Sequence, residues 1–481
     1  NGGKLTAVTT PDHADAYSES FIRFAISRTT DEKVIKALRK VIVKTLSDVR
    51  VAVRDWGKMR QRMRETRDLI ENGPKGVDPL LRTETQALLD WMVDEHFTFL
   101  GYRESKLSKR GKQTFLEVVK GSGLGILSGK SGSGKSIELT TEMQRLARSR
   151  DWLVLTKANS RSTVHRSAFL DYVGVKIYDD KGNAIGERRF VGLLTSIAYS
   201  ESPRNIPFLR HKVRKVFERA HVEEAGHRGK ALLHIIETYP REELFQSSIQ
   251  DLTRTTVGIL NLQDRLRVRM FLRRDAFRRF FSCLVFVPRE KYTTAIRRKI
   301  ETLLIDAFGG VSVDSAVQIS ESALARVHII VRTPESKRPR ISVNKIEQQL
   351  EQLLVTWSDR LSAELLTSFG ADDGEKLFQS YGEMFPAGYQ EDTTPAEACG
   401  DIRTINDMLT NGIERSVDLY SADDVEPGDM RFIVYSLHNP IALSDALPIL
   451  EEMGSAVYTE RPYEATLQSG DSFWIQDFNL R

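Results

Sequence analysis

Apolar and polar residues alternate most regularly in the middle of the chain, from Arg265 onward. Arg265, Arg267 and Arg269 alternate with leucine, valine and methionine, and this period of two predicts a half-buried strand with arginines on its solvent face. The pattern then predicts a strand over 280–287, a helix over 289–308, and strands over 311–319 and 325–331. Two glycines at 309–310 end the helix. We therefore expect a small α+β sandwich of ferredoxin-like type.

A similar order of elements returns at the end of the chain. We predict a strand over 431–437, a helix over 441–453, and strands over 456–462 and 472–478. This βαββ order supplies four elements of a βαββαβ unit, so we expect the chain to be a segment of a longer protein. Between the two sandwiches, residues 341–381 are predicted to be helical because apolar residues recur on one stripe.

The first half of the chain mixes long helical patterns with strands. Residues 19–27 read as a strand, 31–71 as a long helix, and "LLRTETQALLDWMVDEHF" as a second helix. Around Asp179–Asn183, two alternating runs flank a turn rich in Gly and Asn, which predicts a hairpin. Farther on, we predict a helix after Pro207 and two helices divided at Pro240.

Composition and charge place the chain among ordinary globular proteins. Its 481 residues suggest about three domains, and 70 basic against 66 acidic residues leave a net charge of only +4, which gives no overall reason to bind nucleic acid. No apolar run approaches the roughly 18 residues that span a bilayer, and no signal peptide is visible. With two cysteines, we expect a cytoplasmic protein without a disulfide framework, and Cys283 reads as a buried apolar residue of a strand.

The stretch "GKSGSGKS" matches the phosphate-binding loop pattern at Gly129, Gly134, Lys135 and Ser136. An apolar "GILS" precedes it and a predicted helix, "SIELTTEMQRLARS", follows it. Two observations count against a phosphate site. The glycine-rich composition of this stretch makes a chance match to the pattern easy, and no apolar strand ends in the aspartate that magnesium would need. We interpret the stretch as a loop. No histidine spacing predicts a metal site, and no G-x-G-x-x-G, G-x-S-x-G or other catalytic pattern is present.

Several long blocks occur in one order and carry a family resemblance. They are "HFTFLGYRE", "GSGLGIL", "LVLTKANSRSTVHR", "YVGVK", "GERRFVGLLTS", "SPRNIP", "GKALLHIIETYPREELFQ" and "SCLVFVPREKY", with "ERPYE" and "FWIQDF" near the C-terminus. Together they resemble the N-terminal regulatory region of the large bacterial NAD-dependent glutamate dehydrogenases. The resemblance implies an α+β multi-domain fold, in which ACT-type modules and a PAS-like domain are joined by helical linkers. It also implies that the catalytic domain and its NAD lie beyond Arg481, so we carry no catalytic or cofactor-binding residue onto this chain.

The resemblance sets the expected organisation of the chain. We expect a partial ACT-like module (1–50), a helical linker (51–79), a PAS-like domain (80–240), an ACT-like module (241–335), a helical segment (336–395) and a partial ACT-like module (396–481). In ACT-like modules the turn after the first strand often meets an amino-acid effector, which points here to Arg289 and Asn439.

The expected role is regulation and oligomerisation rather than catalysis. The expected partners are the protein's own catalytic domain and other subunits, in a tetramer or hexamer, with no membrane and no nucleic acid. Two other classes of function stay open. The chain could be a nucleotide-binding protein using Gly129–Ser136, or an RNA-binding module using the basic stretch Arg265–Arg279.

Overall fold

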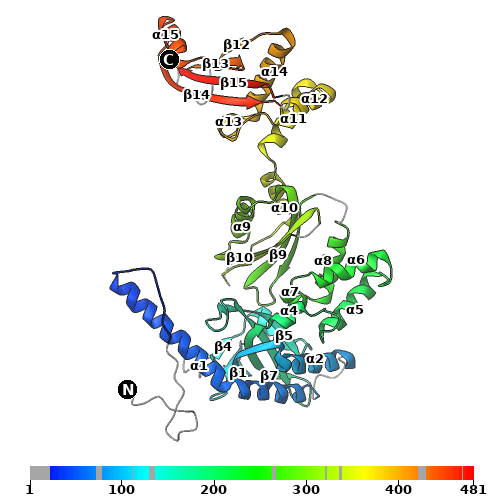
Figure 1. The fold of residues 1–481 in the computed structure, drawn as a ribbon. Helices are drawn as coiled ribbons and strands as arrows, with labels where there is room; N and C mark the ends of the chain where they lie inside the picture. The colour runs from blue at the N-terminus through cyan, green and yellow to red at the C-terminus, as the bar shows by residue number, and fades with distance from the viewer. Residues whose placement is uncertain are drawn as a thin grey trace, which may run out of the picture. The chain divides into compact units, whose positions relative to one another are not determined.

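The computed structural model describes residues 22–71, 78–111, 113–128, 136–262, 267–319, 322–334, 339–420, 430–467 and 470–481. The chain divides into two compact units, residues 1–263 with 275–279, and residues 264–274 with 280–481. Both units combine helices with antiparallel sheets, which confirms the predicted α+β class (Figure 1). No helix in the described part of the chain is long and apolar enough to cross a bilayer.

The first unit is built on one antiparallel sheet. Its described strands are β1 (Phe97–Arg110), β2 (Gln113–Val118), β3 (Leu124–Gly125), β4 (Ser136–Glu138), β5 (Leu153–Arg161), β6 (Phe169–Tyr178) and β7 (Ala184–Leu194). They pair in the order β4-β2-β1-β7-β6-β5, with β3 on β1, so β5 is an edge strand. The predicted hairpin is confirmed as β6–β7, and Gly182 takes the positive φ of 80° that its turn requires.

Helices surround this sheet. They are α1 (Glu32–Leu69), α2 (Pro79–Trp91), α3 (Thr141–Arg148), α4 (Ser196–Ser200), α5 (Leu209–Ala220), α6 (His227–Glu237), α7 (Arg241–Gln246) and α8 (Ile249–Leu260). The long helix α1 begins where the Asp31 side chain accepts the Lys33 N–H at 2.8 Å. Its C-terminal half buries residues such as Ala52 and Met59, whereas its N-terminal half is largely exposed. Pro240 separates α6 from α7, as predicted.

Two expectations for the first unit need correction, and one helix was missed. Residues 22–30 form no regular element, although 19–27 had the alternation of a strand, because no described strand pairs with them. Residues 19–21 lie outside the described part. The helix predicted directly after the "GKSGSGKS" loop begins only at Thr141. Helix α8 was not predicted at all.

The second unit contains two four-stranded antiparallel sheets. The first has the order β10-β11-β9-β8 and consists of β8 (Arg269–Arg274), β9 (Phe280–Pro288), β10 (Ser312–Gln318) and β11 (Leu324–Arg332). Helices α9 (Thr294–Phe308) and α10 (Val343–Leu353) pack on it, burying Ile300, Leu304 and Leu350. Gly309 ends α9 with a φ of 60°, as the sequence predicts.

The second sheet of this unit has the order β12-β13-β15-β14. Its strands are β12 (Arg415–Tyr420), β13 (Met430–Leu437), β14 (Val457–Thr466) and β15 (Ser472–Leu480), accompanied by α11 (Trp357–Phe369), α12 (Ala371–Tyr381), α13 (Ala387–Asp392), α14 (Pro395–Asn411) and α15 (Leu443–Glu452). One face buries Ile433 and Tyr435 against α11–α14, and the other buries Val434 against α15. The helical region 341–381 is thus three helices, and strand β12 was missed.

Candidate functional site

The phosphate-loop interpretation depends on Gly129, Gly134, Lys135 and Ser136. The first three lie outside the described residues. Ser136 begins β4, which pairs antiparallel with β2, where Glu117 lies opposite it. A hydroxyl that binds magnesium in such loops stands at the start of a helix that follows a parallel strand. Ser136 stands in a different setting, so its structure gives this interpretation no support.

The two residues expected to meet an effector lie in turns between a strand and a helix, although β9 and β13 are the second strands of their sheets in chain order and not the first. Arg289 follows β9 in a short turn before α9, and its N–H donates to the Ala323 carbonyl at 2.9 Å. Asn439 follows β13, next to His438 with a φ of 68°. The Gln476 side chain closes this second turn by bonding the N–H and C=O of Ile441 at 2.7 and 2.9 Å. Effector binding at either turn stays a prediction.

The basic stretch Arg265–Arg279 is largely occupied by internal contacts. The alternation is confirmed for its described part, since Val268 and Met270 are buried. Arg269 pairs with Glu347 at 2.9 Å, Arg278 with Glu142 at 2.8 Å and Arg279 with Asp275 at 3.0 Å. Because these arginines already face carboxylates, they offer little charge to an RNA backbone.

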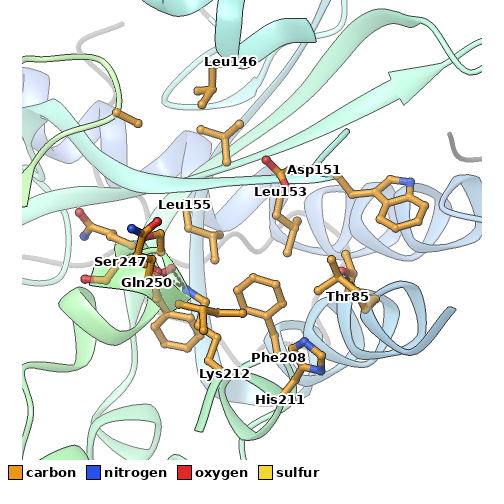
Figure 2. Close-up of a pocket in the computed structure, with 18 of the residues that line it drawn as sticks. Thr85, Leu146, Asp151, Leu153, Leu155, Phe208, His211, Lys212, Ser247 and Gln250 are labelled. Atoms are coloured by element: carbon orange, nitrogen blue, oxygen red, sulfur yellow. Dashed lines mark hydrogen bonds between the residues drawn. The ribbon is translucent and has the colours of Figure 1, made fainter. Parts of the chain in front are cut away.

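One feature with binding potential was not visible in the sequence. A cavity of about 490 Å³ lies in the first unit, among β5, α2, α5 and the connection from α7 to α8 (Figure 2). Leu153 and Leu155 on β5 point into it from one side, and Phe208 lies opposite (Figure 2). The volume falls within the range of small-molecule sites, which is about 300–1,000 Å³.

Lys212 on α5 forms the base of this cavity. Its ammonium group is buried and donates to three backbone carbonyls, those of Leu244 at 3.0 Å and of Phe245 and Ser247 at 2.8 Å. It also lies 4.9 Å from the centre of the Phe208 ring. The carbonyls belong to the C-terminal end of α7 and the residues after it, where a cation is favourable. The charge is thus compensated within the protein, and it ties α5 to the α7–α8 connection.

Phe208 has an uncommon backbone conformation, with φ of 68° and ψ of −43°. The Glu84 carboxylate on α2 stabilises it by accepting the Phe208 N–H at 2.8 Å, and also pairs with Arg210 at 2.9 Å. Bulky residues adopt positive φ only where their surroundings hold them, and such strain gathers at functional sites. Beside it, burial and then the neighbouring Arg214 lower the pKa of His211, so this imidazole is neutral at pH 7.

A buried ionic network fixes the sheet to α7 next to the cavity. Lys157 on β5 pairs with Asp171 on β6 at 2.7 Å and with Glu242 on α7 at 3.4 Å. Tyr199 also donates to Glu242, and Asp171 accepts the Leu194 N–H at 3.1 Å. Burial opposes the charge of Lys157, but Asp171 and Glu242 outweigh it and raise the pKa of the lysine. Strand β5 and α7 therefore hold the cavity wall in a fixed position.

Sequence reasoning could not assemble this cavity, because its lining residues come from elements separated by more than a hundred positions. One local signal was present. Lys212 falls between Leu209, Val213 and Val216 on the buried face of α5, where a lysine needs a specific partner.

Comparison with known proteins gives consistent matches. Four family models match, described as glutamate dehydrogenase helical motif 1 (residues 206–265), ACT2 domain (269–358), helical motif 2 (364–407) and ACT3 domain (414–481). The two sheets of the second unit are therefore ACT-type modules. Three proteins named NAD-specific glutamate dehydrogenase are similar, from Halomonas elongata (34% identical over 99% of this chain), Pseudomonas aeruginosa (33% over 96%) and Mycobacterium tuberculosis (30% over 96%). The chain spans 28–30% of the length of these relatives. It belongs to the family of large NAD-specific glutamate dehydrogenases.

Proposed function

We propose that this chain is a non-catalytic regulatory and oligomerisation segment of a large NAD-dependent glutamate dehydrogenase. The parent enzyme would convert L-glutamate, NAD and water to 2-oxoglutarate, ammonia and NADH. One observation carries the proposal. The chain matches models of ACT domains and helical motifs, while spanning under a third of relatives that carry the dehydrogenase name. The catalytic site and its NAD would then lie in another part of the parent protein.

The fold supports a role in regulation and assembly. ACT-type modules leave sheet edges open, and here the edge strands β10 and β12 carry exposed apolar residues, including Val317, Val417 and Leu419. Open edges suit pairing with another chain. The partners would be the protein's own catalytic domain and other subunits, in a tetramer or hexamer. The antiparallel sheet of the first unit would serve as the PAS-like domain.

The catalytic part of the proposal is tested by incubating the 481-residue chain with L-glutamate and NAD and following NADH by its absorbance. We expect no NADH above a protein-free control. Formation of NADH that scales with the concentration of the chain would refute the proposal.

The regulatory part is tested by titrating amino acids while following the melting temperature of the chain. A ligand at 100 times its Kd stabilises the folded state by about 2.7 kcal/mol. Arg289→Ala and Asn439→Ala should reduce this shift if the effector lies at the ACT-module turns. The matched control is Arg298→Ala on α9, which should leave the shift unchanged. An unchanged melting temperature with every amino acid would count against an effector role.

A further inference from the structure

We propose that the cavity between β5 and α5 binds an α-amino acid with an apolar or aromatic side chain. The proposal places an effector site in the first unit, apart from the ACT-module turns, and for its regulatory meaning it rests on the proposed function. Binding itself can be measured on this chain directly.

One side of the cavity is apolar and suits a hydrocarbon or aromatic side chain. Leu153 and Leu155 are only half-buried, because β5 is an edge strand and the cavity leaves their side chains uncovered (Figure 2). Phe208 faces them from the opposite side, and Phe245 and Leu146 also line the cavity. Apolar surface that faces a cavity gains about 25 cal/mol for each Å² that a ligand covers. The wall therefore favours leucine- or phenylalanine-like groups over small polar ones.

Charges of both signs also line the cavity. Asp151 and Arg219 are exposed there, and neither forms an ion pair with another described residue. The Lys212 ammonium is saturated by carbonyls, so it adds positive potential without a free donor. One anion and one available cation match a zwitterion. A nucleotide would bring several negative phosphate charges to a site that offers one free cation among its described lining residues. The Asp151 carboxylate would repel those phosphates.

Unused backbone hydrogen-bond donors also line the cavity. Ile249 and Gln250 begin α8 and line the cavity, and their N–H groups have no acceptor within the described chain. Such groups favour a carboxylate.

The proposal is tested by calorimetric titration of the 481-residue chain with L-phenylalanine and L-leucine, with glycine and AMP as comparison ligands. We expect binding of L-phenylalanine or L-leucine at millimolar or lower concentration, and at least tenfold weaker binding of glycine and AMP. Arg219→Ala removes the free cation, and Leu153→Trp fills the cavity, so each should weaken binding at least tenfold. The control is Arg254→Ala, an exposed arginine of α8 that does not line the cavity, and it should leave binding unchanged.

The outcomes separate this inference from the proposed function. Absence of binding by either apolar amino acid, tighter binding of AMP, or full binding by both Arg219→Ala and Leu153→Trp would overturn the inference. If binding is instead lost in Arg289→Ala or Asn439→Ala, the effector site lies in the ACT-type modules, and the proposed regulatory function stands without this cavity.

Discussion

Lys212 gives the sharpest prediction about stability, because its ammonium group is the shared donor to three buried carbonyls. Lys212→Met keeps a side chain of similar length and removes the charge and all three donors. The carbonyls of Leu244, Phe245 and Ser247 would then lose their partner in a site where Lys212 itself is only 7% exposed. We expect the first unit to be destabilised and α7 to lose its attachment to α5.

Two opposing contributions set the expected loss of unfolding free energy in Lys212→Met. Each unsatisfied buried carbonyl costs about 1–3 kcal/mol, so three cost roughly 3–9 kcal/mol. Against this, methionine avoids the desolvation of a buried ammonium group, which is several kcal/mol. The net loss should be about 3 kcal/mol. In a unit of this size, 1 kcal/mol corresponds to about 2–4 °C, so the melting temperature should fall by roughly 6–12 °C.

Two measurements check this prediction. Differential scanning calorimetry gives the melting temperature of the first unit, and hydrogen exchange reports whether amides of α7 and of the α7–α8 connection lose protection. The matched control is Lys215→Met, on the same helix, whose ammonium pairs with Glu218 at the surface. Its effect should stay within about 0.5 kcal/mol. If Lys212→Met melts within about 1.5 °C of the control, the three hydrogen bonds do not stabilise the fold as argued.

Two further predictions concern a buried carboxyl and two glycines. Burial raises the pKa of Asp401 to about 6, because it outweighs the lowering effect of hydrogen bonds from the hydroxyls of Tyr389 and Tyr435. The carboxyl therefore binds a proton more tightly in the folded state than in the unfolded state. The free energy of unfolding of the second unit should therefore fall by up to about 3 kcal/mol as pH rises from 4 to 7. Urea unfolding at both pH values should show this fall in the natural protein and not in Asp401→Asn. An identical pH slope in both proteins would contradict this. Gly192→Ala would place Cβ 2.1 Å from the Thr98 carbonyl oxygen of the neighbouring strand, and it should lower the free energy of unfolding by about 1–3 kcal/mol. Gly57→Ala on α1 meets no atom within 4 Å, and it should raise the free energy of unfolding by about 0.5–1 kcal/mol. Thermal unfolding measures both effects. Equal melting temperatures for the two glycine variants would refute the steric argument.

The sequence alone predicted the elements whose patterns are local. Period-two alternation in and before β8, the apolar run of β9 and the glycine that ends α9 gave the first ACT-type sandwich its order of elements. The hairpin β6–β7 followed in the same way from its turn residues. These features depend on neighbouring positions, so a single sequence carries them.

Other elements depended on long-range partners. Residues 22–26 have the alternation of a strand, yet they pair with no described strand, and Ile22 and Phe24 are exposed. Strand β12 is an edge strand in which Val417 and Leu419 alternate with Asp418 but stay exposed, and it is defined by pairing with β13. A strand needs hydrogen bonds from a neighbouring strand, and sequence periodicity cannot show whether that neighbour is there.

The candidate site shows the same division more strongly. A residue pattern identified the loop motif Gly129–Ser136, and the family resemblance pointed to the turns at Arg289 and Asn439, because each of these features is contiguous in sequence. The cavity beside β5 joins Leu153, Phe208, Lys212 and the start of α8 across the chain, and no spacing encodes it. The sequence by itself determined which segments could form strands, helices and turns. Only the tertiary structure decided which of them meet, because a cavity and a buried ammonium group are products of packing between elements far apart in the chain.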